Sequence, residues 1–367
     1  MAAIKIAVFS SKAYDKKYLE EALTSKKDKA AGAPASSTGT QAPSVDLVFH
    51  EFPLDVDTVP LARGATAVCV FVNDVLNGAV LEALHSEGVG AVLLRCAGYN
   101  HVDLGVAETL GLFVAHVPSY SPEAVAEFSV ALLQTLNRRT HRAYNRVREG
   151  NFSLDGLLGS TLHGKTVGVV GTGRIGVATA RIYKGYGCRI LAYDPYESKD
   201  FVDEKLGDYI ADLADLLPQC DFVSLHCPLT KDTHHLINER SLATMKEGAL
   251  LVNTSRGGLV STKAIIAALK NRRLGGVALD VYEGEGNLFY DDHSGDIIED
   301  DVLMRLMTFP NAIVCGHQAF FTVEALTEIA AVTLQNFEDY LRQHECKNSL
   351  VQSHKLFVRR DSYPVRI

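Results

Sequence analysis

Short runs of Val, Ile and Leu recur along the chain, and longer stretches with apolar residues at helical spacing lie between them. This alternation is typical of βαβ units, because parallel strands buried on both faces are almost continuously apolar. The pattern therefore predicts two series of strands, each forming a parallel sheet. The first series is residues 4–9, 47–49, 67–71, 91–94 and 113–115, and the second is residues 166–170, 189–193, 221–225, 250–253, 277–279 and 312–314.

Two long helices are predicted outside the strand series. One spans residues 122–145, with Ser121 at the N-cap position and Pro122 in the first turn. We expect this helix to cross from one domain to the other. The second spans about residues 323–342 and is expected to return to the first domain, which would then be discontinuous. The predicted domains are residues 1–118 with 317–367, and residues 119–316.

One segment interrupts the pattern near the N-terminus. Residues 25–44 are mostly Lys, Ala, Gly, Ser, Thr and Pro, a composition typical of a mobile surface insertion. The tail beyond Ser353 mixes basic residues with Phe357 and Tyr363, and its pattern assigns it no role.

Composition narrows the class of protein. A chain of 367 residues can bury two sizeable cores, and its 47% hydrophobic and 22% charged residues are typical of globular proteins. The formal net charge of -8 leaves no basic excess for broad binding to nucleic acid or anionic membranes. The seven cysteines are never spaced as CxxC, which argues against a disulfide framework or a zinc site.

No apolar run reaches the length of a bilayer span, and no signal-like segment precedes the first strand. We therefore expect a soluble protein of a reducing compartment. This would be the cytoplasm, or an organelle if a targeting segment is missing from the sequence.

A glycine motif follows the first strand of the second series. Gly171, Gly173 and Gly176 form GxGxxG between an apolar strand and the start of a helix. Gly171 permits the tight turn, Gly173 lets the backbone approach a pyrophosphate, and Gly176 allows close helix packing. The amides of Arg174 and Ile175 would face the pyrophosphate at the positive end of the helix. The motif predicts a dinucleotide site.

An acidic residue stands where such a site needs one. Asp194 ends the next strand, at roughly the 20-residue spacing typical of dinucleotide-binding domains. A carboxylate there can accept both adenosine ribose hydroxyls and would repel a 2′-phosphate. NAD is therefore expected rather than NADP.

Polar residues follow three later strands of the second series, at residues 253–257, 280–285 and 316–321. Ligands of open α/β sheets bind at this edge. Reduction of a 2-oxo acid requires a cation for the carboxylate, a proton donor for the carbonyl oxygen and a group that orients that donor. Arg256 can engage a carboxylate through two donors, and His317 can give or take the proton. Glu285 can orient the imidazole.

Three other features have simpler explanations. The adjacent His234 and His235 have no carboxylate or thiol cluster beside them, so no metal site is predicted. Cys227 is expected to be a small apolar wall of the nicotinamide pocket rather than a nucleophile. The arginine-rich residues 138–148 are expected to form a solvated helix face or a subunit contact rather than a nucleic-acid patch.

Several motifs resemble those of the D-2-hydroxyacid dehydrogenase family, and most closely its fermentative D-lactate branch. The resemblance covers nearly the whole chain, and only the 25–44 insertion and the longer tail depart from it. The motifs that carry it are residues 15–18, 71–74, 95–100, 136–139, 226–230 and 316–320. The implied architecture is α/β, with a Rossmann NAD-binding domain inserted into a discontinuous flavodoxin-like substrate domain.

The resemblance also implies a role for each residue of the predicted site. Arg256, Glu285 and His317 would be the catalytic trio. The residues expected at the NAD cofactor are Gly171, Gly173, Arg174, Ile175, Gly176, Asp194, Cys227, Pro228, Thr233, Thr254, Ser255 and Asp280. The residues expected to bind or line the substrate are Ala97, Gly98, Tyr120, Arg256 and Phe320, with amides near Ala97 and Gly98 holding its carboxylate.

The expected activity is reversible hydride transfer between NADH and pyruvate, giving D-lactate, in a cleft that closes between the two domains. An aromatic pocket wall discriminates one methylene by only ~1 to 3 kcal/mol, so a broader D-2-hydroxyacid or glyoxylate reductase is an alternative. A second alternative is a dinucleotide-sensing protein similar to a corepressor. The expected partners are pyruvate or D-lactate and further copies of the chain, as a homodimer or homotetramer, with no nucleic acid and no membrane.

Overall fold

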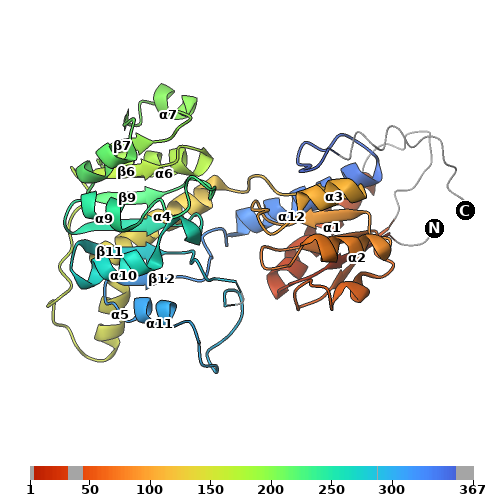
Figure 1. Ribbon diagram of the computed structural model, residues 1–367, viewed down its shortest axis with the longest axis horizontal. Helices are drawn as coiled ribbons and strands as arrows, with labels where there is room; N and C mark the ends of the chain where they lie inside the picture. Colours follow the sequence, from red (N-terminus) through yellow and green to blue (C-terminus); the bar gives the residue numbers. More distant parts are fainter. Residues whose placement is uncertain (1–3, 32–43, 287, 353–367) are drawn as a thin grey trace, which may run out of the picture. The chain divides into compact units, whose positions relative to one another are not determined.

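The computed structural model describes residues 4–31, 44–286 and 288–352 (Figure 1). It divides into two compact units, Met1–Tyr120 with Thr322–Ile367, and Ser121–Phe321. These divisions lie a few residues C-terminal of the expected boundaries at 118/119 and 316/317. The second division moves because the segment after β12 (Ala312–Val314) is bound to its own unit: the His317 amide donates to the Asp280 carbonyl at 2.7 Å.

The first unit is a five-stranded parallel sheet covered by helices. Its strands lie in the order β2-β1-β3-β4-β5, which is the flavodoxin-like order. The strands are β1 (Ile4–Val8), β2 (Val45–Phe49), β3 (Ala67–Val70), β4 (Ala91–Leu94) and β5 (Phe113–Ala115). The helices are α1 (Ala13–Ala31), η1 (Val59–Ala62), α2 (Gly78–Ser86), α3 (Leu104–Leu110) and α12 (Val323–Leu341).

The C-terminal helix α12 contributes to the core of this first unit. Its Ala330, Leu334 and Phe337 are buried in one cluster with Leu93 and Phe113 of the sheet. The helix also packs beside α1. The apolar spacing that predicts this helix therefore describes the face it buries.

The second unit is a seven-stranded parallel sheet in the order β12-β11-β10-β9-β6-β7-β8. Counted within the unit, this is the Rossmann order 3-2-1-4-5-6 with one added strand. The other strands are β6 (Thr166–Val170), β7 (Arg189–Tyr193), β8 (Asp208–Tyr209), β9 (Phe222–Leu225), β10 (Ala249–Asn253) and β11 (Leu274–Leu279). The helices are α4 (Pro122–Arg138), α5 (Thr140–Arg148), α6 (Arg174–Gly185), α7 (Lys199–Asp203), α8 (Leu213–Leu216), η2 (Leu217–Gln219), α9 (Glu239–Thr244), η3 (Gly257–Leu259), α10 (Thr262–Lys270) and α11 (Asp301–Met307).

Both faces of this second sheet are buried, each in its own hydrophobic cluster. Leu133 of α4 and Tyr183 of α6 pack on one face against Val167. Ile265 of α10 packs on the other face, in the cluster that contains Leu225. Burial on both faces explains why the strands appear in the sequence as nearly unbroken apolar runs.

The prediction of one helix over residues 122–145 is wrong, because the structure breaks it at Arg139. That residue has φ +50°, which ends α4, and α5 starts at the next residue. A neighbouring segment occupies the space at the break: an added Cβ at Gly159 would lie 2.4 Å from the Asn137 carbonyl oxygen. The Asn137 side chain also donates to Ser160 O and accepts from Ser160 N.

Three smaller predictions also need correction. Ser121 occupies the N-cap position of α4 but has φ 34° and makes no side-chain cap hydrogen bond. Helix α1 continues to Ala31, so the first part of the predicted 25–44 insertion is helical. Residues 32–43, and the tail from residue 353, lie outside the described residues. Strand β8 has no counterpart among the predicted strands.

The arginines of α5 and its N-cap bind the chain that follows. Arg139 donates to the carbonyls of Gly156 and Leu158, at 2.9 and 2.7 Å. Arg146 donates to the carbonyls of Ser153 and Asp155, at 3.0 and 2.8 Å. Part of this arginine-rich run therefore holds residues 153–158 in place, a role that the expected solvated face did not include.

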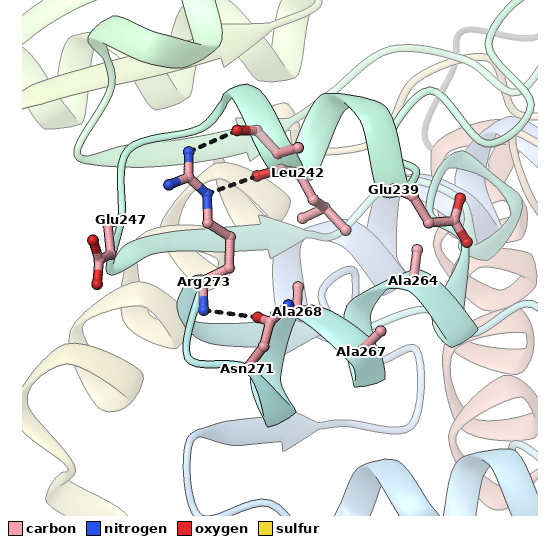
Figure 2. A pocket seen from close by; sticks show the side chains of 9 residues that line it. Glu239, Leu242, Glu247, Ala264, Ala267, Ala268, Asn271 and Arg273 are labelled. Carbon is pink, nitrogen blue, oxygen red and sulfur yellow. Dashed lines mark hydrogen bonds between the residues drawn. The ribbon is translucent and has the colours of Figure 1, made fainter.

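A surface groove of about 510 Å³ lies between α9 and α10 (Figure 2). The Arg273 guanidinium beside it donates to the carbonyl oxygens of Leu242 and Ala243 near the end of α9 (Figure 2). It also donates to the carbonyl oxygen of Met245, the C-cap residue of this helix. These carbonyls have no partner within the helix, so Arg273 serves as a side-chain cap. The cap fixes α9 to the start of β11.

Candidate active site in the dinucleotide-binding unit

The glycine loop between β6 and α6 fits a dinucleotide phosphate. Gly171 has φ +95°, and a Cβ there would lie 2.6 Å from Cys227 N. A Cβ at Gly176 would lie 1.9 Å from Gly171 O, so α6 can approach the loop only with glycine at that position. A Cβ at Gly173 would meet nothing within 4 Å. No described protein atom would clash with a side chain at position 173. The absence of a side chain there therefore suits a ligand that approaches the backbone closely.

Helix α6 supplies the donors at this loop. Gly173 is its N-cap residue and offers no side-chain cap, so the amides of Arg174 and Ile175 lie at an uncapped, positive helix end. An uncapped N-terminus behind an open glycine is a suitable anion site.

Asp194 lies just after β7 and is held rigidly next to this loop. Its Oδ2 accepts from the amide and hydroxyl of Thr172, at 2.6 and 3.1 Å, and its Oδ1 accepts from the Tyr196 amide at 2.9 Å. The Tyr209 hydroxyl donates to the Thr172 hydroxyl at 2.8 Å. Among the described residues, Oδ2 accepts two hydrogen bonds and Oδ1 only one, so Oδ1 keeps acceptor capacity for a further donor such as a ribose hydroxyl.

Cys227 and Ser255 meet at the same edge of the sheet. The Ser255 hydroxyl donates to the Cys227 carbonyl at 2.6 Å, and the Cys227 amide lies beside Gly171. Burial raises the pKa of the Cys227 thiol to about 11, so the side chain is a neutral thiol. A buried neutral thiol packs as a small apolar side chain.

Thr233 and Thr254 differ in how they are held. The Thr233 hydroxyl donates to the Pro228 carbonyl at 2.7 Å and so fixes the turn between them. The buried Thr254 Oγ1 has no hydrogen-bond partner in the part of the chain that the structure describes. A buried hydroxyl without a partner is costly, which fits a ligand that completes it.

Asp280 follows β11 and anchors the segment that carries His317. Its Oδ1 and Oδ2 accept from the amides of Gln318 and Ala319, at 2.9 and 2.8 Å. Burial raises the pKa of Asp280 although these two hydrogen bonds oppose the shift. Asp280 therefore holds the backbone of residues 318 and 319 in place, directly after His317.

The structure brings Glu285 and His317 together. His317 Nδ1 lies 3.1 Å from Glu285 Oε1, and Glu285 Oε2 accepts from the Tyr282 amide at 3.0 Å. Because a carboxylate accepts, Nδ1 carries the hydrogen and Nε2 faces away from Glu285. His317 has φ 54°, and its side chain keeps 17% exposure. The pair is ordered but still open to a small molecule.

Arg256 stands on a segment packed against that of Glu285. A Cβ at the neighbouring Gly257 would lie 2.1 Å from the Tyr282 carbonyl carbon, so the two backbones touch. The Arg256 guanidinium donates to Ser255 O at 2.7 Å. No hydrogen bond or ion pair among the described residues joins Arg256 to Glu285 or His317.

The predicted substrate residues are divided between the two units. Ala97, Gly98 and Tyr120 belong to the first unit, and all three are partly buried. Phe320 belongs to the second unit, where it is buried and packs edge-on against Phe321 with ring centroids 6.1 Å apart.

One polar network at the site was not predicted from the sequence. Glu283 Oε1 lies 2.5 Å from His235 Nε2, while its Oε2 accepts from the Thr262 amide at 2.7 Å. The network ties His235 and the start of α10 at Thr262 to the segment that also carries Glu285. The adjacent His234 and His235, for which the sequence predicts no metal site, gave no indication of an ion pair with Glu283. No group of three or more possible metal ligands occurs in the described ranges.

A Rossmann sheet, an open glycine loop and a His–Glu pair at the carboxyl ends of the strands together define an NAD-dependent oxidoreductase. Residues 130–319 match the model of the D-isomer specific 2-hydroxyacid dehydrogenase NAD-binding domain. The chain is 61% identical over 364 residues to 2-hydroxyacid dehydrogenase A of Aspergillus oryzae, covering 99% of this chain and 100% of the relative. It is 57% identical over 358 residues to a D-lactate dehydrogenase of Curvularia clavata, covering 98% of each.

A solved structure gives the same result. The pyruvate reductase of Chlamydomonas reinhardtii superimposes with a TM-score of 0.85 at 40% identity, covering 95% of this chain and 99% of the other. The chain therefore belongs to the D-2-hydroxyacid dehydrogenase family and is an NAD-dependent oxidoreductase acting on small 2-hydroxy or 2-oxo acids. No helix of the described residues is long and apolar enough to cross a membrane.

Proposed function

We propose that this protein reduces pyruvate to D-lactate, reversibly, with NADH as the hydride donor. The observation that carries the proposal is the His317–Glu285 pair, 3.1 Å apart at the carboxyl edge of the dinucleotide-binding sheet. A D-lactate dehydrogenase and a pyruvate reductase among the similar proteins support this choice of substrate.

His317 is the proton donor in this proposal. Its Nδ1 hydrogen is engaged by Glu285, so Nε2 is the atom that protonates the substrate carbonyl oxygen and takes the proton back in oxidation. Glu285 orients the ring, and the Tyr282 amide in turn orients Glu285. When bound, NADH supplies the hydride that reduces the carbonyl carbon.

Arg256 binds the substrate carboxylate. Its planar guanidinium has five N–H donors, and among the described residues only Nη1 has an acceptor, the Ser255 carbonyl. The other N–H groups can form the paired hydrogen bonds that a carboxylate accepts. The other residues assigned to the substrate, which hold it or line its pocket in this proposal, are Ala97, Gly98, Tyr120 and Phe320.

The remaining residues hold NAD. Gly171, Gly173 and Gly176 shape the phosphate loop, and the amides of Arg174 and Ile175 bind the pyrophosphate. Asp194 accepts from the adenosine ribose and disfavours a 2′-phosphate. The other contacts assigned to the cofactor are Cys227, Pro228, Thr233, Thr254, Ser255 and Asp280.

A panel of 2-oxo acids tests the substrate. We expect NADH consumption with pyruvate to exceed that with glyoxylate and phenylpyruvate in kcat/KM, and chiral analysis to find D-lactate. The broader 2-hydroxyacid dehydrogenase named among the relatives favours a second candidate, a D-2-hydroxyacid reductase without a preference for pyruvate. Equal kcat/KM values across the panel would support it. L-lactate, or no turnover of any 2-oxo acid, would refute both.

Replacement of Arg256 tests its role. Arg256→Lys keeps the charge but loses the two-donor fork, so we expect kcat/KM for pyruvate to fall by at least tenfold. The control is Arg240→Lys on the exposed face of α9, which should retain wild-type kinetics. Unchanged kinetics in Arg256→Lys would remove Arg256 from the site.

A homodimer or homotetramer is also part of the proposal, and light scattering of the purified protein measures it. A reducing compartment, the cytoplasm or an organelle, is supported by the cysteines, all seven of which are free thiols.

A further inference from the structure

A turn in the first unit, residues 95–100 after β4, has all of its central carbonyls engaged. The Cys96 carbonyl accepts from the Val117 amide at 3.1 Å. The Ala97 carbonyl lies 2.9 Å from His116 Nδ1, and the Gly98 carbonyl accepts from the Cys96 thiol at 3.2 Å. Three successive peptide groups are therefore held from their oxygen side.

The opposite sides of the same peptide groups are unused. In a trans peptide the N–H points away from the preceding carbonyl oxygen, so each N–H of residues 97–99 is directed away from the group that holds the carbonyl. Within the described residues, the amides of Ala97, Gly98 and Tyr99 donate to no acceptor. Ala97 and Gly98 are partly buried. Successive free amides of this kind suit an anionic oxygen ligand.

His116 is itself fixed from several directions. Its amide donates to the Asn348 carbonyl at 3.2 Å, and its carbonyl accepts from the Asn336 side chain at 2.9 Å. Its ring meets Tyr99 edge to face, with centroids 5.4 Å apart. The ring therefore has little freedom, and Nδ1 must carry the hydrogen because a carbonyl oxygen can only accept.

We propose that His116 is a positioning residue for substrate binding: its Nδ1–H fixes the Ala97 carbonyl and so presents the amides of residues 97–99 to the carboxylate of the 2-oxo acid. This inference rests on the proposed function and deepens it, because it assigns the orientation of these amides to a particular side chain. All 2-oxo acids share the carboxylate, so the role does not depend on which acid is preferred.

Two substitutions separate the position of the donor from the loss of the ring. His116→Asn places an amide N–H near the position of Nδ1, whereas His116→Gln places it near that of Nε2, out of reach of the Ala97 carbonyl. His85→Gln is the control, because His85 is exposed in the last turn of α2 and lies outside the turn. Thermal melting of each variant establishes that it is folded.

The measurements are KM and kcat for pyruvate, the inhibition constant of oxamate, an unreactive carboxylate of the same shape, and the Kd of NADH. We expect His116→Gln to raise KM and the oxamate constant together by about 3- to 10-fold, because one orienting hydrogen bond is lost. The NADH Kd should stay within twofold, and kcat should change less than KM. His116→Asn and His85→Gln should stay within twofold of wild type throughout.

Equal behaviour of the Asn and Gln variants, whether both are unchanged or both impaired, would overturn the proposal, because the Nδ1 position would then not matter. If His116→Gln does not fold, His116→Leu takes its place in the comparison, because leucine has nearly the shape of asparagine and no donor. Equal KM values in His116→Leu and His116→Asn would also overturn the proposal. A wild-type protein that turns over no 2-oxo acid would refute the proposed function instead. The wild-type assay is therefore carried out before the variants are measured.

Discussion

The glycine loop gives a prediction in which two similar substitutions fail for different reasons. Gly171→Ala forces a non-glycine residue into φ +95°, which costs ~1 to 2 kcal/mol. Its Cβ would also lie 2.6 Å from backbone atoms of residues 226 and 227, an overpacking worth ~1 to 3 kcal/mol. The sum is ~2 to 5 kcal/mol, which corresponds to roughly 4 to 20 °C in Tm.

Gly173→Ala should leave the folded state almost unchanged. Gly173 has φ -65° and ψ -172°, which alanine adopts, and the added methyl meets no protein atom within 4 Å. Alanine is a poorer N-cap than glycine by a few tenths of a kcal/mol or more, but it restricts the unfolded chain by ~0.4 to 1 kcal/mol. These effects offset each other, so Tm should move by only about 2 °C. The methyl group would instead displace the pyrophosphate, so we expect the Kd of NADH to rise at least tenfold.

Thermal melting and calorimetric titration with NADH test both variants side by side. The reasoning requires opposite patterns, with Gly171→Ala unstable and Gly173→Ala stable but poor in cofactor binding. A Gly173→Ala protein that binds NADH within twofold of wild type would refute the placement of the pyrophosphate. A Gly171→Ala protein that melts like wild type would refute the structural argument for that turn.

Three further outcomes are expected. Glu285→Gln should lower kcat by ~10- to 100-fold in steady-state assays, because an uncharged amide can turn its NH2 group toward Nδ1 and no longer fixes the orientation of His317; an unchanged kcat would exclude that role. Burial lowers the pKa of His226 to about 3, so the unfolded chain takes up its proton near pH 6.5 while the folded chain does not, and stability falls as pH drops below 6.5. His226→Gln should therefore lose less Tm than wild type between pH 7 and pH 5, and parallel Tm curves would contradict this. Arg273→Ala should lower the free energy of unfolding by about 1 to 3 kcal/mol in urea titrations without affecting kcat, whereas Arg240→Ala should change neither.

The strands were predictable because their burial on both faces leaves a local signature. Five of the eleven expected strands have the predicted bounds, including 113–115 and 189–193, since each lies between polar turns. Strand β8 was missed because two residues carry no periodicity. The break at Arg139 was missed because its cause is not local: the apolar spacing continues through it, and the segment at Gly159 that occupies the space lies 20 residues further on.

The residues of the candidate site were likewise predictable where the sequence carries a local signal, and not where their contacts come from distant segments. Glu285 and His317 could be paired from the sequence because both stand just past strand ends, which meet at one edge of the sheet. The network of Glu283 could not be found in this way, because its partners His235 and Thr262 come from separate segments and carry no shared spacing. The hydrogen bonds from residues 318 and 319 to Asp280 could not be predicted either. The Asp280 carboxylate accepts from backbone amides, and almost every residue type has such an amide.

In the segment after α5, the contacts that fix the backbone do not involve the apolar side chains of the segment itself. Its path is set by donors from Arg139, Arg146 and Asn137 to backbone atoms, while Phe152, Leu154 and Leu158 remain 74 to 87% exposed. The residues that fix the backbone path are therefore different from the residues whose apolar side chains face the solvent. We therefore expect single substitutions of the three apolar side chains to leave the backbone path of this segment in place, whereas loss of Arg139, Arg146 or Asn137 should release it.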